Sequence, residues 1–397
     1  MCLSPGFNET ELLCTRFAHA IESTKGTAFT LELGGNHLPQ LPMRIGSSKV
    51  LDSAVACALA AFTGLQCPHR VTKQYQHKLY IQALSDMRQA VEESRDMDFE
   101  AVFAAMILLG DYEVCSRTEN ALDHAKGAEA ILKAWGPGRL KSAWAMDLLD
   151  VMGTRLIAAS ISTGEECFLD GPEWAEVFDL GISRSSTSFH NWASYKYLKA
   201  FARLANIVRL LRHEATDISP PTKQMITGLW IQVSDLNTEV ETLMHDPTVV
   251  CEQTSRDKSN PFETYYRFSK VQVCEKFSHV WKIYILVSTM MEYYLPAQLT
   301  SEDQEKRAQA AINICKCFEF LRPLKPMGTM FLHLNLPRAA AALPQPYQSW
   351  AFSAYTEIVE SALSIGVDIT GPTELLKRLI AGWNLSSCRE WWLGGWS

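Results

Sequence analysis

Residues 75–91 read YQHKLYIQALSDMRQAV, and the spacing of their apolar side chains decides the fold class. The apolar residues recur at steps of three and four, at Leu79, Tyr80, Ala83, Leu84, Met87, Ala90 and Val91. Such steps place the side chains in one wide stripe along a helix, and the stripe faces a core. The stretch therefore predicts an amphipathic helix.

The segment that follows is predicted to be a buried helix. Asp98 stands where an N-cap is expected, and residues 99–115 are apolar almost all round, as in a helix surrounded by others. Helical periodicity recurs along most of the chain, and only residues 28–33 hint at a strand. We expect further helices over the ranges 121–135, 142–162, 190–213, 222–244, 262–295, 301–321, 347–366 and 372–383.

Together these segments predict an all-α protein. We expect about eight to ten packed helices in a single continuous body over residues 1–397. The polar residues 246–261 are expected to form a flexible loop, and the Gly- and Ser-rich residues 181–188 a surface loop. Residues 301–304 resemble a capping box at the start of a helix.

The composition limits the classes of function. The chain has 397 residues, of which 47% are hydrophobic, and its net charge is −7. An acidic chain is poorly suited to direct nucleic-acid binding, because phosphate contacts need a basic surface. The 11 cysteines are scattered and odd in number, which suits free thiols in a reducing compartment. Residues 280–295, the most apolar stretch, are too short and too polar to cross a membrane, and the start of the chain shows no signal-peptide pattern. We expect a protein of the nucleus or cytoplasm that makes no membrane contact.

Five short motifs occur in order in the first half of the chain. They are LDSAVAC at 51–57, LYIQAL at 79–84, the apolar run 104–113 that ends in Tyr-Glu, HAKGA at 124–128 followed by Gly136-Pro137, and FLDGPEW at 168–174. Together they resemble the C-terminal regulatory region of fungal zinc-cluster transcription factors. The resemblance covers residues 12–175, and residues 190–397 are similar in length and helical character. It implies an all-α regulatory domain that is usually joined to an N-terminal zinc cluster.

The chain departs from this family in its cysteines. A zinc cluster needs six thiolates in two close sets, whereas this sequence has no Cys-x2-Cys pair. Its closest pair, Cys315 and Cys317, lies in a helical pattern where both thiols cannot face one ion. We therefore expect no metal ion and no cofactor.

The leading hypothesis is a regulatory protein that does not read DNA itself. Its expected partners are a small-molecule ligand, another protein or a second copy of the chain. A separate explanation of the missing zinc cluster is that the gene has lost its zinc-cluster exon, or that this sequence omits it.

The alternative hypothesis is a helical scaffold that has become an enzyme of secondary metabolism. A pocket lined by aromatic residues can promote cyclisation or rearrangement by positioning alone. The catalytic candidates are then His124, Glu113 and Tyr112, because a buried histidine beside a carboxylate can move a proton. The favoured interpretation of His124 is instead a helix-packing hydrogen bond beside Gly127.

Several aromatic residues are candidates for ligand binding. They are Trp174, Trp281, Tyr265, Tyr266 and Tyr284. Core packing is the favoured alternative for all of them. The aromatic C-terminal residues 391–396 are expected to pack on the body of the protein or on a partner.

Overall fold

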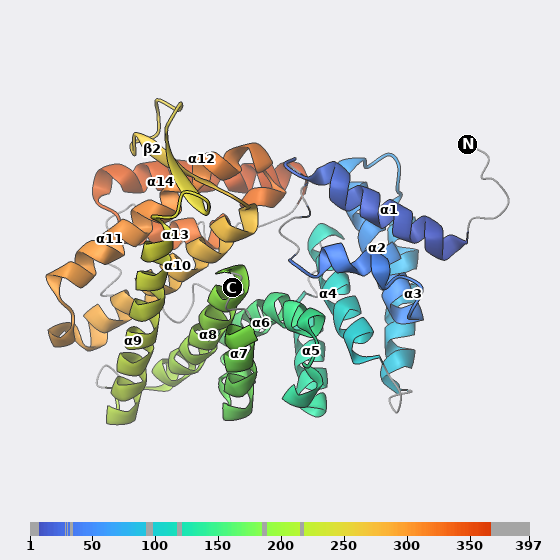
Figure 1. The fold of residues 1–397 in the computed structure, drawn as a ribbon, viewed down its shortest axis with the longest axis horizontal. Helices are drawn as coiled ribbons and strands as arrows, with labels where there is room; N and C mark the ends of the chain where they lie inside the picture. The colour runs from blue at the N-terminus through green and yellow to red at the C-terminus, as the bar shows by residue number, and fades with distance from the viewer. Residues whose placement is uncertain are drawn as a thin grey trace. The chain divides into compact units, whose positions relative to one another are not determined.

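The computed structural model describes residues 8–27, 29, 31, 35–92, 98–116, 121–184, 189–214 and 218–366. Within these ranges the chain forms fourteen α-helices and one two-stranded sheet (Figure 1). The all-α class is confirmed, with more helices than the expected eight to ten. Residue contacts divide the chain into two compact units, one up to Leu156 and one from Ile157 to Ser364.

The first unit is built around a helix that is buried on all sides. Its helices are α1 (Glu9–Thr24), α2 (Lys49–Gln66), α3 (Lys73–Glu92), α4 (Phe99–Ser116), α5 (Ala121–Trp135) and the first part of α6 (Ala143–Thr163). Every residue in 101–110 of α4 is buried, and α4 contacts α2, α3 and α5. Asp98 Oδ1 accepts a hydrogen bond from the Ala101 backbone N–H at 3.1 Å. The predicted buried helix and its N-cap are both confirmed.

The second unit repeats this plan around α10. Its helices are α7 (Pro172–Arg184), α8 (Phe189–His213), α9 (Pro220–Leu243), α10 (Val271–Tyr294), α11 (Ser301–Lys316), α12 (Phe318–Leu321), α13 (Leu332–Ala342) and α14 (Gln345–Ser364). Helix α10 contacts α8, α9, α11 and α13, and every residue from Phe277 to Met291 is buried. Polar side chains in this segment therefore need partners within the protein.

A β-hairpin replaces part of the predicted loop and helix. Strand β1 (Val250–Thr254) pairs antiparallel with β2 (Thr264–Phe268). The prediction of a flexible loop over 246–261 and of a helix starting at 262 was therefore wrong. Along β2, Tyr266 and Phe268 are buried while Arg267 is exposed, which is the two-residue period of a strand. Helix α10 begins only at Val271.

The predicted surface loop at 181–188 was also wrong at its start. Gly181 is buried inside α7, and a Cβ atom at this position would lie 2.6 Å from the ring of Tyr195 in α8. The glycine therefore permits a close approach of two helices, which accounts for it without a loop.

One helix boundary and one whole helix differ from the sequence-based expectation. The capping box of α11 is made by Thr300 and Asp303, one residue before the predicted position. Helix α13 was not predicted, because Pro337 lies inside it and a proline argues against a helix interior. Residues 372–383 and 391–396, and most of 28–33, lie outside the described ranges.

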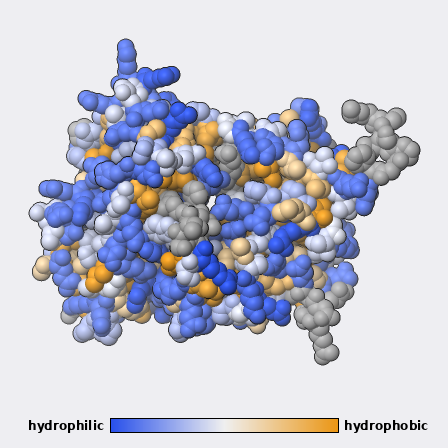
Figure 2. Space-filling view, in the orientation of Figure 1, coloured by the Kyte–Doolittle hydropathy of each residue, from blue (hydrophilic) through white to orange (hydrophobic). Residues whose placement is uncertain are grey.

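The side of the molecule seen in Figure 2 is mainly hydrophilic, with hydrophobic side chains in small scattered groups. In the part of the chain that the structure describes, no helix is both long enough and apolar enough to cross a membrane.

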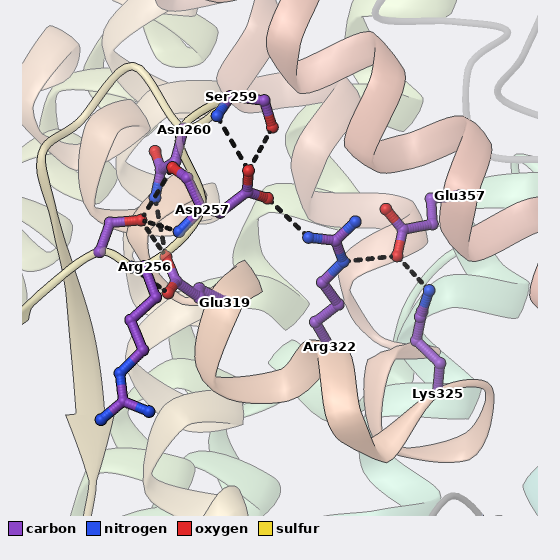
Figure 3. Close-up of polar contacts among 9 residues, drawn as sticks. Arg256, Asp257, Ser259, Asn260, Glu319, Arg322, Lys325 and Glu357 are labelled. Atoms are coloured by element: carbon purple, nitrogen blue, oxygen red, sulfur yellow. Dashed lines mark hydrogen bonds and ion pairs between the residues drawn. The ribbon is translucent and has the colours of Figure 1, made fainter.

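Carboxylates fasten the loop of the hairpin to the helices beneath it (Figure 3). Glu319 of α12 accepts hydrogen bonds from Ser255 Oγ at 2.6 Å, from the Arg256 backbone N–H at 3.1 Å and from Asn260 Nδ2 at 3.1 Å. The side chain of Arg256 itself points away from this network. Glu319 thus supplies the acceptors that a polar loop between two strands would otherwise find in water.

A chain of ion pairs continues from the same loop. Asp257 pairs with Arg322 at 2.6 Å, and the Arg322 Nε atom lies 2.7 Å from Glu357 of α14. Lys325 also binds Glu357. Segments far apart in the sequence, namely the hairpin loop, the end of α12 and α14, are therefore joined by charge-assisted contacts.

We predict that Glu319→Ala loosens the hairpin while leaving α10 intact. Losing an acceptor shared by three donors is expected to cost about 1–3 kcal/mol of unfolding free energy. Hydrogen–deuterium exchange should rise in residues 250–268 and stay unchanged in residues 277–291. The matched control is Glu305→Ala, an exposed carboxylate on α11, which should alter neither segment. Equal exchange in the two variants would contradict the anchoring role of Glu319.

Candidate functional site

Two hydroxyl groups of α10 are satisfied within the helix itself. Ser288 and Thr289 are buried, and both donate to the carbonyl oxygen of Ile285, at 3.0 and 2.8 Å. Such bonds to the preceding turn are the ordinary solution for a hydroxyl inside a helix. These two residues therefore need no ligand.

Other polar residues of α10 lack that solution. Ser278 Oγ accepts a hydrogen bond from Asn335 Nδ2 of α13 at 2.5 Å, but Asn335 Oδ1 has no partner among the described residues. His279 Nδ1 is likewise buried without a hydrogen bond in the described part of the chain. Lys282 is 4% exposed, and no described residue forms a hydrogen bond or ion pair with it. Three neighbouring buried groups thus have unused bonding capacity.

Aromatic rings surround these groups. Lys282 Nζ lies 5.8 Å from the ring centroid of Tyr197 and 5.4 Å from that of Phe201, both on α8. The His279 ring stacks on Tyr197 with centroids 5.3 Å apart, and it meets the edge of Phe331 at 6.0 Å. The ammonium and the imidazole therefore share the ring of Tyr197. A cation over aromatic rings gains some attraction, but far less than a buried charge loses in leaving water.

Two further basic residues complete what we call the Lys282 cluster: Lys282, His279, His333 and Arg338. The pKa of Lys282 is lowered to about 7, mainly by burial and also by the charge of Arg338, while Glu275 acts in the opposite direction. Burial also lowers the pKa of His333 to about 4 and holds the pKa of His279 well below its usual range. Burial lowers the pKa of Arg338 only to about 10. At neutral pH the imidazoles are therefore uncharged, Arg338 is charged, and Lys282 is close to its midpoint.

This arrangement is suited to an anion rather than to a metal ion. Cations already crowd the cluster, and a metal would add to their repulsion. Within the described ranges, no group of three or more His, Cys, Asp and Glu side chains is placed to hold a metal ion. An anion would supply a countercharge to Lys282, with which no described residue forms an ion pair, and would accept hydrogen bonds from its ammonium group.

The predicted catalytic residues of the first unit form an internal contact instead. Glu113 is fully buried in α4, and its Oε1 accepts a hydrogen bond from the Tyr80 hydroxyl of α3 at 2.5 Å. The Tyr112 ring stacks on Tyr80, with centroids 4.5 Å apart and planes at 11°. The side chain of His124 lies outside the described residues. The structure thus brings Tyr112 and Glu113 to Tyr80, which the sequence analysis did not single out as a partner.

The predicted ligand-binding aromatic residues are spread over several places. Trp174 packs edge-on against Phe168 at 5.0 Å, and Tyr284 lies 5.2 Å from Trp230.

The other three of these aromatic residues lie near the hairpin. Trp281 is fully buried in α10, with its ring 6.4 Å from that of Tyr266. Tyr265 and Tyr266 stand on β2, where their hydroxyls donate to Gln253 at 2.8 Å and to Asn313 at 2.9 Å. Most of these contacts are those of core packing, and they hold the hairpin and α10 together.

The sequence carried one signal of the Lys282 cluster. Lys282 interrupts the most apolar stretch of the chain, where a charge needs a specific reason. The same lysine also argues against a membrane span over residues 280–295. His333 and Arg338 carried no such signal, because no helix was expected there.

Comparisons with known proteins identify neither a family nor an activity. No family profile matches the chain, and no solved structure matches it. One similar protein is an uncharacterised protein of Emericella nidulans, which is 28% identical over 125 residues. The match covers 31% of this chain and 27% of the length of that protein.

We predict that Tyr80→Phe destabilises the first unit. The substitution keeps the ring on Tyr112 but removes a hydrogen bond to a buried carboxylate, with an expected loss of about 1–3 kcal/mol. Urea unfolding followed by circular dichroism measures this loss. Tyr75→Phe, at an exposed tyrosine of the same helix, is the control and should change little. Equal midpoints for the two variants would show that the contact with Glu113 contributes nothing measurable.

We predict that Lys282→Met stabilises the ligand-free protein near neutral pH. The unfolded chain keeps the lysine proton up to about pH 10, whereas the folded state releases it near pH 7. Over that interval the folded state binds fewer protons, so the stability of the wild type should rise with pH. The linkage relation gives a difference on the order of 3–5 kcal/mol in favour of the methionine at low pH.

Urea unfolding at about pH 6 and about pH 9 tests this prediction. The advantage of Lys282→Met should be largest at the lower pH and should shrink at the higher one. Lys270→Met replaces an exposed lysine just before the same helix and serves as the control. A destabilised Lys282→Met variant, or an advantage independent of pH, would contradict the burial of an uncompensated ammonium.

Proposed function

We propose that this chain is a regulatory protein, not an enzyme, and that it responds to a small molecule bound inside its second unit. One observation carries the proposal, namely that Lys282 and His279 lie within the most buried helix of the unit, where no described residue forms a hydrogen bond with Lys282 or with His279 Nδ1. Native proteins satisfy the great majority of their buried polar groups, and clusters of exceptions mark functional sites. The Lys282 cluster is such an exception.

The position of the cluster supports a regulatory role. Helix α10 contacts four other helices, so a ligand that compensates Lys282 stabilises the packing of the whole unit. A ligand present at about a hundred times its Kd adds about 2.7 kcal/mol to the stability of the folded state. A ligand-dependent gain of this size is enough to change how much folded protein is available to a partner.

Two features of the sequence also support a regulatory role. The ordered motifs at 51–57, 79–84 and 168–174 resemble the regulatory region of fungal zinc-cluster transcription factors. The net charge of −7 favours action through a ligand or a protein partner over direct contact with DNA. The nucleus and the cytoplasm are the compartments in which such a regulator acts.

The test is to incubate the purified protein with a small-molecule extract of its source organism. Mass spectrometry then follows the compounds that are retained and those that are newly formed, with heat-denatured protein as the control. We expect at least one compound to be retained unchanged and to raise the melting temperature. Conversion of a compound by the native protein alone would make the chain an enzyme and overturn the proposal. Retention of no compound would overturn it as well.

A further inference from the structure

The charge balance of the Lys282 cluster limits what can bind there. Lys282 and Arg338 are both buried, the charge of Arg338 lowers the pKa of Lys282, and no described residue forms an ion pair with Lys282. A buried ammonium without a countercharge costs several kcal/mol. A neutral ligand would leave that cost in place, and a cationic ligand would increase it. An anionic ligand removes it.

The hydrogen-bonding groups define where such an anion sits. Lys282 Nζ and the His279 ring both lie against Tyr197, one helical turn apart on α10. Residues three apart on a helix face the same side, so an anion over Tyr197 is within reach of both. The ammonium offers its donors, and His279 Nδ1 has no partner in the described part of the chain and can donate in the tautomer that carries its proton there. A group with two acceptor oxygens fits this pair.

The surroundings decide between classes of anion. The groups beside Lys282 and His279 are the rings of Tyr197, Phe201 and Phe331. A phosphate dianion needs donors on several sides, and the ring faces of Tyr197, Phe201 and Phe331 supply none. A carboxylate carries one charge on one end and leaves the rest of the molecule free to pack against rings.

We infer that the Lys282 cluster binds a small organic carboxylate, with its anionic end on Lys282 and His279 and its apolar body against Tyr197 and Phe201. This inference rests on the proposed function and names the chemical class of its ligand. Asn335 bonds to Ser278, the residue before His279, and its Oδ1 atom has no partner among the described residues.

Proton uptake is a second consequence of this binding mode. The charged and titratable groups around Lys282 are Glu275 and His279 of α10 and His333 and Arg338 of α13, with Tyr197 facing it from α8. The pKa of Lys282 is lowered to about 7, so this amino group can take up a proton close to neutral pH. A bound carboxylate favours the charged ammonium, so binding slightly above neutral pH draws up to one proton from the buffer.

Isothermal titration calorimetry on the full chain provides the test. The probes are octanoate and 1-naphthoate, their primary amides, and inorganic phosphate, each up to millimolar concentration. We expect a carboxylate to bind and its amide to bind at least about tenfold more weakly, since an amide provides no countercharge. At about pH 8, the measured heat should differ between Tris and HEPES buffers by the amount that proton uptake requires.

Variants locate the binding at the cluster. Lys282→Met should weaken carboxylate binding at least about thirtyfold and abolish the proton uptake. His279→Phe keeps a ring on Tyr197 and should weaken binding by a smaller factor. Lys270→Met, at an exposed position, should bind like the wild type. Because Lys282→Met removes a buried charge, it should fold, and its unfolding transition confirms this.

The outcomes separate this inference from the proposed function. Equal affinity for a carboxylate and its amide, full affinity in Lys282→Met, tighter binding of phosphate, or no binding of either carboxylate would overturn the inference. Capture of a neutral compound from the extract would preserve the proposed function and overturn the inference alone. Carboxylate binding at Lys282, with conversion of an extract compound, would overturn the proposed function and keep the inference.

Discussion

The burial of α10 on every side is the constraint on which the second unit depends. A helix that contacts α8, α9, α11 and α13 has no solvated face, so each polar side chain from Phe277 to Met291 must be satisfied inside the protein. Ser288 and Thr289 meet this demand through the carbonyl oxygen of Ile285. Lys282 does not, and a helix this deeply buried would be more stable with an apolar residue in its place. A lysine at such a position is accounted for if a bound anion supplies its missing ion pair.

Both units bury a central helix on all sides, but their buried polar groups are bonded in different ways. In the first unit, the buried carboxylate of Glu113 accepts a hydrogen bond from the Tyr80 hydroxyl, and Tyr112 stacks on the same ring. That arrangement joins α3 to α4 and engages the tyrosine hydroxyl in a structural hydrogen bond. In the second unit, the ring of Tyr197 is also shared by two neighbours, but those neighbours are an imidazole and an ammonium. In the first unit the carboxylate of Glu113 is thus bonded directly to the shared tyrosine, whereas no described carboxylate forms an ion pair with Lys282.

The helices were predictable wherever packing follows a single periodicity. The stripe of residues 75–91 and the all-round apolar segment 99–115 correspond to α3 and α4, because burial on one face or on all faces produces a recognisable spacing of apolar residues in the sequence.

The β-hairpin was not predictable in this way. Tyr265 and Tyr266 also satisfy a helical pattern when read together with α10, and the strand forms because β1 pairs with it from a distance along the chain. Helix α13 was missed because of Pro337. His333 and Arg338 lie on that helix. No local sequence pattern could therefore have predicted the whole Lys282 cluster, although Lys282 itself was recognisable as a charge in an apolar stretch.

The distribution of thiols has a consequence for the lifetime of the protein. Cys274, Cys315 and Cys317 are all buried in the second unit, and burial raises the pKa of Cys274 and Cys315, so their reactive thiolate forms are scarce. In the first unit, burial raises the pKa of the Cys57 thiol to about 12. Oxidants and electrophiles therefore react poorly with Cys57, Cys274 and Cys315 while the helices are packed, and more readily once they open. Chemical damage at these three thiols is coupled to unfolding, so whatever holds the helices closed also protects the sulfur atoms buried between them.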